Sequence, residues 1–332
     1  MPPDALVSLA ADLLEAHAGG TGLGYGGASY SAAEIHRIVE TLNIFFFACV
    51  NPDGRAHSQT VASGWRKNRR PAPTGMTGAD CVGVDLNRNF DFLWDHTARF
   101  AADSGVSASS SPCHPTLYRG PSAASEPETR NVVAILDRFP RIRWHVDVHS
   151  AVPVVLHSWG DDENQSGAPG DSFLNPALDT VRGRLGDGVG EFVSAADVAI
   201  ITELAQRIGA GVQDAHGAVY DVEQAMTLYP TSGASDDYAY SRHFANPVLN
   251  RVYAWTIECG TSFQPAWPTA VEVIGEVSSG LVRLALGAHA VTDGLAVSLR
   301  TPAVAFVDVP EGRRPRAPSA GTAAGPSTCT SR

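Results

Sequence analysis

One short apolar segment of the chain carries two histidines and an aspartate at alternate positions, His145, Asp147 and His149. Alternate residues of a β-strand lie on the same face, so these three side chains would converge there. Two imidazoles and a carboxylate could bind a metal ion, and a buried structural histidine beside a structural aspartate explains the segment equally well. His149 is the better placed for function, because ligands of open α/β sheets bind beyond the carboxyl ends of the strands.

Other segments carry polar side chains that could hold or act on a substrate. Asn87 and Arg88 follow a short apolar segment, and a guanidinium beside an amide can hold a carboxylate, although a structural loop arginine fits equally well. Glu258 ends an apolar strand pattern, where a carboxylate needs a partner ion or a chemical role. Arg66 opens a basic run that by itself is more typical of a solvated loop, and Tyr229 alone indicates nothing.

Strands and helices that alternate along the chain must position these residues. Ser31 and Glu34 form a capping-box pattern at the start of one helix. The alternation predicts an α/β layered fold with a buried sheet. Apolar runs predict strands over 43–50, 82–85, 142–149 and 252–259, and helical spacing predicts helices over 4–17, 31–42, 125–139 and 269–286.

Composition excludes several classes of partner. The formal net charge of −11 argues against a nucleic-acid partner, and no apolar run approaches the roughly 20 residues that span a bilayer. The five cysteines have no CxxC spacing, which argues against a cysteine zinc site. Cys81 and Cys113 flank a loop and could pair, which would indicate an oxidising compartment.

The character of the chain changes after residue 286, so we expect one large domain over residues 1–286. Residues 295–309 alternate as in a strand, which predicts that a small β-rich segment begins within 287–312. Residues 313–332 are rich in Arg, Pro, Ala, Ser and Gly and should form a disordered tail.

Taken together and in order, these segments resemble the zinc carboxypeptidases of the carboxypeptidase A/B type over roughly residues 1–286. The resemblance implies an α/β fold with a mixed, mostly parallel central sheet and helices on both faces. The segments that carry it are Asn51-Pro52-Asp53-Gly54, Trp65-Arg66-Lys67, Cys81 to Asn89, Ser111-Pro112-Cys113, Val148-His149-Ser150, Tyr229 and Ile257-Glu258.

The resemblance implies a metalloprotease that uses one Zn²⁺ ion to hydrolyse the C-terminal peptide bond of peptides or proteins. His149 would be a zinc ligand, Glu258 the general base, and Arg66 the group that polarises the scissile carbonyl. These residue types suit the reaction, because a metal-bound water needs only a modest base and the oxyanion needs a fixed cation. The full-length protein would be secreted, although the leading residues of this chain contain no signal peptide.

The resemblance also assigns the residues that would recognise the substrate. Asn87, Arg88 and Tyr229 would hold its free C-terminal carboxylate, which argues against a related amidohydrolase that acts on a non-peptide substrate. Cys81 and Cys113 match a disulfide that is common in the family.

One segment bears on the choice of substrate. Residues 232–238 resemble the pocket segment of the carboxypeptidase B branch, in which the position of Asp236 lies at the base of the side-chain pocket. A carboxylate there would favour C-terminal Lys or Arg. If Asp236 points elsewhere, the pocket would prefer apolar residues instead.

The chain departs from the family at the zinc site. Two of the family's ligands stand in a His-x-x-Glu motif, and no histidine here is followed three positions later by glutamate. His36 and Glu40 are four apart on a helix expected to be peripheral, and His17 ends another helix, so neither replaces the motif. We therefore expect a chain that is truncated before the motif, lacks the first elements of the fold and keeps His149 as its one family ligand.

A catalytic zinc needs about three protein ligands, so we expect little or no activity from the chain as it stands. Two interpretations remain open for the molecule. One is a zinc-dependent exopeptidase that has lost part of its sequence. The other is a non-catalytic remnant of the same fold that binds peptide C termini.

Overall fold

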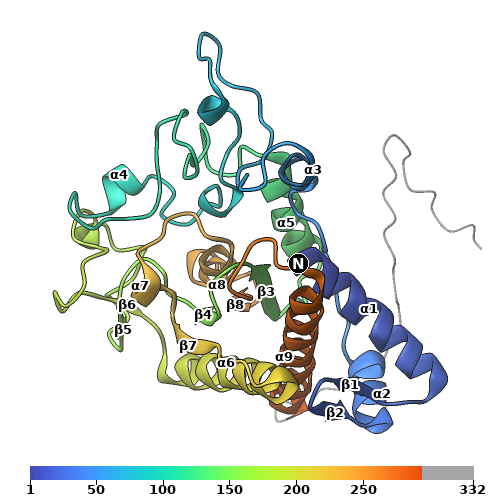
Figure 1. Cartoon of the computed structure of the whole chain (residues 1–332). Coiled ribbons are helices and arrows are strands. Elements are labelled where there is room, and N and C mark those ends of the chain that lie inside the picture. The colour runs from blue at the N-terminus through green and yellow to red at the C-terminus, as the bar shows by residue number, and fades with distance from the viewer. Residues whose placement is uncertain (294–332) are drawn as a thin grey trace, which may run out of the picture. The chain divides into compact units, whose positions relative to one another are not determined.

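The computed structural model describes residues 1–293 (Figure 1). A four-stranded sheet lies at the centre of these residues, with the strands in the order β3-β8-β4-β7. β3 pairs parallel with β8, β4 pairs parallel with β7, and β4 runs antiparallel to β8. The prediction of a mixed, mostly parallel sheet is therefore confirmed. The strands are β3 (Trp144–His149), β4 (Val154–His157), β7 (Asp221–Gln224) and β8 (Tyr253–Glu258).

Helices flank this sheet. α6 (Ala195–His216) packs against β4, β7 and β8, and α9 (Trp267–Asp293) lies along α6 (Figure 1). α8 (Ser235–Ala245) packs against β3 and β8. Buried apolar residues of the sheet and helices form the main core, in which Trp255 is fully buried. Burial of such large side chains is the main force that holds the layers together.

The N-terminal residues form a smaller layer against α9. α1 (Pro2–Gly19) and α2 (Ala32–Thr41) are joined by a hairpin, and a second apolar core lies between them and α9. The capping box at the start of α2 is confirmed, because Ser31 Oγ accepts from Glu34 N at 3.3 Å and Ser31 N donates to Glu34 Oε2 at 2.7 Å. The hairpin strands are β1 (Leu23–Tyr25) and β2 (Ala28–Tyr30).

The remaining elements are short and lie among long loops. They are the helices α3 (Pro52–Thr60), α4 (His96–Arg99), α5 (Pro127–Arg138) and α7 (Ala225–Leu228), the strands β5 (Asn164–Ser166) and β6 (Gly190–Phe192), and the 3-10 turns Ala79–Cys81, Leu86–Arg88 and Pro176–Leu178. Among residues 1–293, no helix has both the length and the apolar character required to cross a lipid bilayer.

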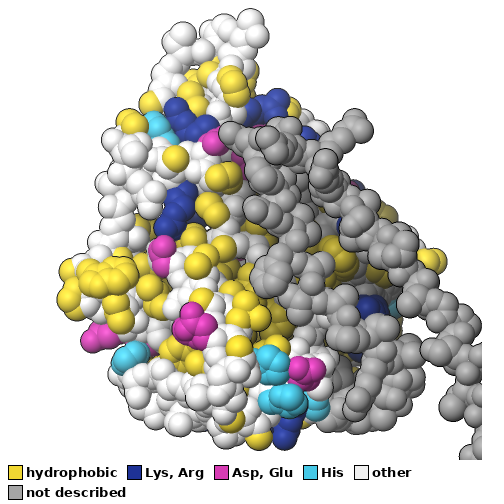
Figure 2. Space-filling view, turned by 90° about the vertical axis from the view of Figure 1, so that its right-hand side faces the viewer, with side chains coloured by type: hydrophobic (Ala, Val, Ile, Leu, Met, Phe, Trp, Pro, Cys, Tyr) yellow, Lys and Arg dark blue, Asp and Glu magenta, His cyan; other side chains and the backbone are white. Residues whose placement is uncertain are grey.

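Two predicted strands are wrong. Residues 43–50 form no strand, because none of the described segments lies beside them as a hydrogen-bonded neighbour. Ile44 and Phe45 there are 42% and 44% exposed, and apolar side chains reach the surface at several points of the face in Figure 2. Residues 82–85 fail for a local reason, since Gly83 has a φ of +86° and turns the backbone to donate to Arg70 O at 2.8 Å.

Prolines shift three predicted helix starts by two residues. α1 begins at Pro2, α5 at Pro127, and α9 at Trp267, which is followed by Pro268. Proline fits the first helical turn because its missing N–H has no partner there in any case. α9 also continues to Asp293, so residues 287–293 of the segment predicted to be β-rich are helical. The rest of that prediction, and the predicted disordered tail, lie outside the described residues.

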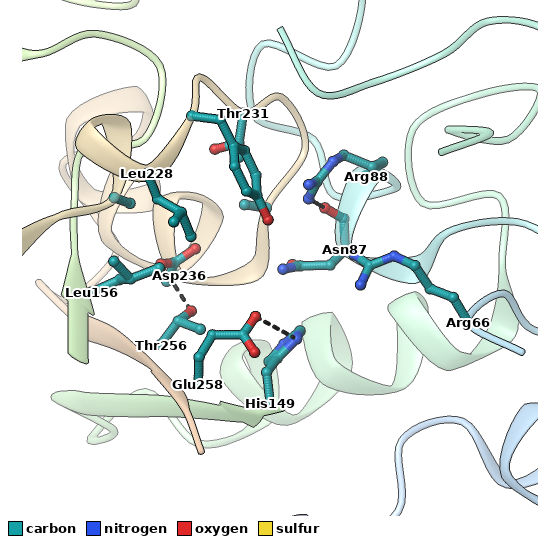
Figure 3. Close-up of a pocket in the computed structure, with 13 residues that line it drawn as sticks. Arg66, Asn87, Arg88, His149, Leu156, Leu228, Thr231, Asp236, Thr256 and Glu258 are labelled. Carbon is teal, nitrogen blue, oxygen red and sulfur yellow. Dashed lines mark hydrogen bonds and ion pairs between the residues drawn. The ribbon is translucent and has the colours of Figure 1, made fainter. Parts of the chain in front are cut away.

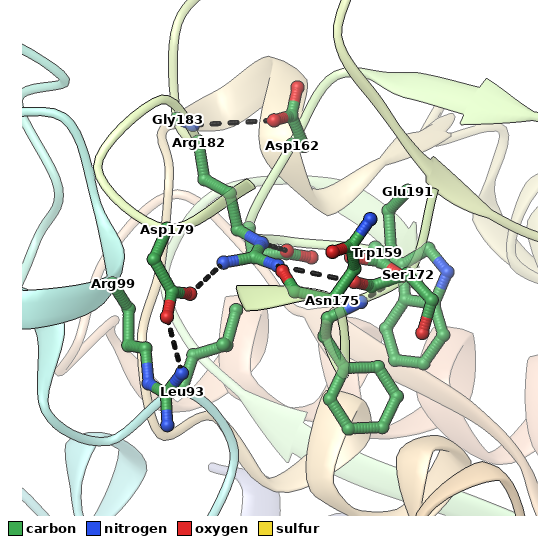
Figure 4. Close-up of polar contacts among 12 residues, drawn as sticks. Leu93, Arg99, Trp159, Asp162, Ser172, Asn175, Asp179, Arg182, Gly183 and Glu191 are labelled. Carbon is green, nitrogen blue, oxygen red and sulfur yellow. Dashed lines mark hydrogen bonds and ion pairs between the residues drawn. The ribbon is translucent and has the colours of Figure 1, made fainter. Parts of the chain in front are cut away.

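One buried arginine organises the loops between β4 and α6. Arg182 is fully buried, and its Nη1 donates to Asp179 Oδ1 at 2.5 Å while its Nη2 donates to two backbone carbonyls (Figure 4). Its Nε lies 3.9 Å from Asp161, and Asp162 and Glu191 are buried nearby. We call these five residues the Arg182 cluster. The adjacent Gly160 accepts from Thr231 N at 2.7 Å, so the cluster supports a loop that reaches the site described next.

Candidate functional site

An open cleft lies at the carboxyl ends of β3 and β8 (Figure 3). It encloses about 410 Å³, including the part that is open to solvent. The cleft brings together the residues that the family resemblance assigns to catalysis, substrate binding and metal binding, whereas His145 and Asp147, the other candidate metal ligands of the same strand, do not line the cleft. Its lining consists of Arg66, Asn87, Arg88, His149, Leu156, Ala225, Leu228, Tyr229, Thr231, Ala234, Asp236, Thr256 and Glu258.

Strand register places two of these side chains next to each other. His149 ends β3 and Glu258 ends β8, and the two residues are direct partners in the parallel pair. Both residues are the last of their strands, so their side chains stand at the edge of the sheet. This edge is where open α/β sheets bind their ligands.

His149 is oriented by a carboxylate. Its Nε2 lies 3.0 Å from Asp147 Oδ2, and its Nδ1 faces Glu258 Oε1 at 3.9 Å. Ser235 Oγ donates to the same Asp147 carboxylate. Burial lowers the pKa of His149, but the neighbouring Asp147 outweighs this effect and raises the pKa to about 9. The ring thus presents Nδ1 to the cleft, while Nε2 is fixed from behind.

Glu258 differs from the other carboxylates of the cleft. Its Oε2 atom is buried, and among the described residues it has no hydrogen-bond partner. Burial raises the pKa of Glu258, although His149 and Arg66 oppose the shift. A carboxylate with a free, desolvated oxygen is a stronger base than one in water.

The two arginines of the cleft share one buried carboxylate. Arg66 Nε donates to Asp85 Oδ2 at 2.9 Å, and Asp85 is 2% exposed. Burial raises the pKa of Asp85, but Arg66 and Arg88 outweigh that effect and hold it below its usual value. Asp85 in turn raises the pKa of Arg66. Two cations therefore face one anion on this side of the cleft, which leaves it net positive.

Backbone contacts hold the neighbouring side chains in place. Arg88 Nη1 donates to Asn87 O at 2.5 Å, and its Nε donates to Ser107 O. Asn87 Oδ1 accepts from Ser235 N at 2.8 Å, so its amide nitrogen points into the cleft (Figure 3). Tyr229 lines the cleft from the residue after α7 and is 40% exposed.

Asp236 lies on the opposite side of the cleft from Arg66 and Arg88 (Figure 3). It is 3% exposed. Its Oδ1 accepts from Asp237 N and its Oδ2 from Thr256 Oγ1, both at 3.0 Å. The cleft is therefore polarised, with cations on one side and a buried carboxylate on the other.

The cleft residues do not fit a catalytic zinc ion. Such an ion needs about three protein ligands, and His149 and Glu258 are the only metal-binding side chains that face each other in the cleft of the described chain. Within residues 1–293, three such donor atoms lie within 4.8 Å of one another in one group only, on α1 and α2. No residue of that group lines the cleft.

Sequence reasoning missed the residues that support the site. Asp85, Ser235 and Thr256 hold Arg66, Asp147 and Asp236 in place. Only Asp85 had a signal in the sequence. It stands three residues before Arg88, and a buried arginine needs a counter-ion.

The loop that carries Arg66 is tied down from two sides. Cys81 and Cys113 form a disulfide, and Lys67 Nζ donates to the carbonyls of Asp80 and His114 at 2.6 and 2.9 Å.

Comparisons with known proteins agree with this arrangement. A family profile described as zinc carboxypeptidase matches residues 1–273. Carboxypeptidase A2 of Rattus norvegicus is 29% identical over 213 residues, which is 62% of this chain and 39% of the relative. Carboxypeptidase B of Astacus astacus is 30% identical over 230 residues, covering 69% and 60%. The chain thus spans about two fifths of the length of the rat relative.

Solved structures share the fold. Bovine thrombin-activatable fibrinolysis inhibitor, in complex with tick carboxypeptidase inhibitor, aligns with a TM-score of 0.54 and 22% identity over 74% of this chain and 68% of that one. Carboxypeptidase A from Helicoverpa armigera aligns with a TM-score of 0.53 and 24% identity over 74% and 51%. At such identities the likeness shows the fold alone.

Proposed function

Because the chain belongs to the zinc carboxypeptidase family, we propose that its cleft recognises the C-terminal residue of a peptide. The observation that carries the proposal is the polarity of the cleft, in which Arg66 and Arg88 face Asp236. A free C-terminal residue with a cationic side chain has the complementary pattern, since its carboxylate and its side chain carry opposite charges.

The carboxylate would bind on the side of the arginines. Arg88 and Asn87 offer N–H donors there, and a guanidinium matches the two oxygens of a carboxylate. The hydroxyl of Tyr229 would add a donor from the open side of the cleft, because this residue is 40% exposed. The net positive charge beside Asp85 would strengthen this binding.

Asp236 would select the side chain of the substrate. Its carboxylate is buried and lines the cleft, and its two hydrogen bonds come from Thr256 and from the backbone of Asp237 rather than from a cation. A Lys or Arg side chain would supply the missing countercharge. We therefore expect C-terminal Lys or Arg to bind better than an apolar residue.

The zinc chemistry of the family belongs, in this proposal, to the whole protein and not to the described residues. In the whole protein, Glu258 would accept a proton from a molecule bound in the cleft, and Arg66 would stabilise negative charge beside it. One imidazole lines the cleft, that of His149, and it would be the zinc ligand. We therefore propose that residues 1–332 bind peptide C termini and do not hydrolyse them, which favours the non-catalytic alternative for this polypeptide.

The compartment is also a proposal. The disulfide between Cys81 and Cys113 supports an oxidising environment, and hence secretion of the whole protein. Peptides or proteins with free C termini are the partners that we expect there.

One experiment separates binding from hydrolysis. Purified residues 1–332 are incubated with ZnCl₂ and a fluorescent peptide that ends in Arg, and cleavage is followed by mass spectrometry while binding is followed by anisotropy. The proposal predicts saturable binding without loss of the terminal residue. Robust hydrolysis would refute the proposal that this chain has too few zinc ligands for catalysis. Absence of binding would refute the proposal that the cleft recognises peptide C termini.

A pair of peptides that differ in the last residue tests the specificity of binding. The same sequence ended in Arg or in Phe should bind with at least about tenfold preference for Arg, because one hydrogen bond to a charged group contributes about 1.5–3 kcal/mol. A clear preference for Phe would show that Asp236 does not face the side chain of the substrate.

A further inference from the structure

A second group of histidine and carboxylate side chains lies outside the cleft. His17 stands in the last turn of α1, and His36 and Glu40 stand one turn apart on α2. Residues four apart share a helix face, so His36 and Glu40 project in the same direction. α1 and α2 pack against each other, which brings His17 to that face.

The three side chains are close enough to share an ion. One ligand atom of each lies within 4.8 Å of the others, and His17 Nε2 is already 2.9 Å from Glu40 Oε1. The rings of His17 and His36 have centroids 5.3 Å apart. Ligand atoms of a tetrahedral zinc are about 3.3 Å apart when the bonds are about 2.0–2.1 Å. His36 and Glu40 are exposed, so small rotations of their side chains can close the difference.

Burial selects the ligand atom of His17. Its Nδ1 is buried and has no hydrogen-bond partner within the described chain, so Nε2 is the nitrogen that faces Glu40. Two imidazoles and one carboxylate are a donor set that suits Zn²⁺, whereas Ca²⁺ and Mg²⁺ prefer oxygen ligands alone. The site lies at the surface, so water can supply a fourth ligand.

We propose that His17, His36 and Glu40 form a zinc site that links the end of α1 to α2. Its role is structural, because none of the three residues lines the cleft and no substrate-binding group lies among them. A bound ion would cross-link residues 17 and 36 around the β1–β2 hairpin. An ion that binds the folded chain and not the unfolded one stabilises the fold by mass action.

The test counts zinc and measures stability on the whole chain. It is made in a His149→Ala background, so that zinc held by the imidazole of the cleft does not count. Metal-free protein is titrated with ZnCl₂, bound zinc is measured after gel filtration, and the melting temperature is recorded. His36→Gln and Glu40→Gln remove ligands, while His216→Gln and Glu15→Gln are controls, because both wild-type residues are exposed on helices and lie outside the group.

One zinc ion per chain should bind in the background protein and in both controls. At zinc concentrations about 100-fold above Kd, the melting temperature should rise by roughly 5 °C. His36→Gln and Glu40→Gln should each lower zinc affinity at least about tenfold and abolish the rise, and CaCl₂ should have no effect. Equal zinc binding by the ligand variants and the controls would overturn the proposal, and so would the absence of bound zinc in the background protein. If His149→Ala does not fold, the same variants are compared in the wild-type chain. The proposal then predicts two classes of zinc site in the wild-type chain and the controls, and one class in His36→Gln and Glu40→Gln.

Discussion

The cleft and the Arg182 cluster both contain buried charged groups. Cations are in excess on the arginine side of the cleft, and carboxylates are in excess in the cluster. In the cleft, two guanidinium groups share the carboxylate of Asp85. In the Arg182 cluster, one arginine lies among several carboxylates, which include Asp179 and Glu191 (Figure 4). Surplus cations in the cleft leave donors for a ligand, whereas surplus acids in the cluster can stay buried only by keeping protons.

The pKa shifts follow this difference. In the cleft, the pKa of Asp85 lies below its usual value because its arginines outweigh burial. In the cluster, burial raises the pKa of Asp161 to about 6, that of Asp162 to about 7 and that of Glu191 to about 10. We infer that buried charge in this chain has two uses, ligand recognition in the cleft and loop support in the cluster. Changes in one region should therefore affect binding, and changes in the other should affect stability.

The largest expected effect is the loss of Arg182. Arg182→Met would leave Asp161 and Asp179 without their buried partner, and breaking such a pair costs about 3–5 kcal/mol of the free energy of unfolding. Urea denaturation measures the change. Arg184→Met is the matched control, because Arg184 and its partner Asp103 are 41% and 72% exposed, and it should change stability by less than about 0.5 kcal/mol. Equal effects of the two variants would show that the cluster does not support the loops.

The next effect falls on the cleft. Asp236→Asn should reduce the preference for Arg-ended over Phe-ended peptides by about 1.5–3 kcal/mol, because the countercharge of the side chain is lost. The amide oxygen can still accept from Asp237 N, and the amide nitrogen can donate to Thr256 Oγ1 once that hydroxyl rotates, so the free energy of unfolding should change little. Fluorescence anisotropy with both peptides measures the preference. An unchanged preference together with a large loss of stability would show that Asp236 supports the fold and does not select the substrate.

A smaller effect concerns pH. A carboxyl whose pKa is raised by folding stabilises the fold while it is protonated, and this contribution is lost as pH rises from the unfolded pKa towards the folded one. For Glu191, with a folded pKa of about 10, the window starts near its ordinary value of 4.5. Glu191→Gln should therefore leave stability unchanged at pH 4 and raise it by at least about 1 kcal/mol at pH 8.

Chemical denaturation of both proteins across that pH range tests the sign. The amide oxygen can still accept from Phe173 N, as Glu191 Oε1 does at 2.6 Å, so geometry is kept. A variant that is less stable than the wild-type chain at pH 8 would mean that Glu191 is ionised and paired in the folded protein.

The smallest effect is at the open side of the cleft. Tyr229→Phe removes one hydroxyl donor from a residue that is 40% exposed, and should weaken peptide binding by about 0.5–1.5 kcal/mol. Stability should not change. Isothermal titration with an Arg-ended peptide measures the loss, and an amide-ended peptide serves as the control that should show none. Equal losses of affinity for both peptides would show that Tyr229 does not bind the carboxylate of the peptide.

The site was predictable from sequence because its signals are local. Polar residues at alternate positions predicted the strand that ends at His149, an apolar run predicted the strand that ends at Glu258, and the strand register then placed the two residues side by side. Asn87 and Arg88 are neighbours in the sequence and lie in one 3-10 turn, although the strand predicted before them at 82–85 does not form. The resemblance to the family placed these signals in order, and the cleft contains all of them.

What could not be predicted depends on contacts between distant segments. The strand expected at 43–50 needs a neighbour, and its composition does not say whether one exists. The carboxylates of the Arg182 cluster come from two loops and from β6, with no shared periodicity, so no pattern marks them as neighbours. On α2 the spacing of His36 and Glu40 was visible, but only the packing of α1 adds His17.

The most direct test of the account compares two peptides that differ in one group. An Arg-ended peptide with a free C-terminal carboxylate and the same peptide with a C-terminal carboxamide are titrated into the wild-type chain and into Arg88→Lys. The peptide with the free carboxylate should bind at least about tenfold tighter to the wild-type chain, and this advantage should shrink in Arg88→Lys because the planar fork of donors is lost. Equal affinity of the wild-type chain for both peptides would contradict the proposal that this cleft recognises peptide C termini.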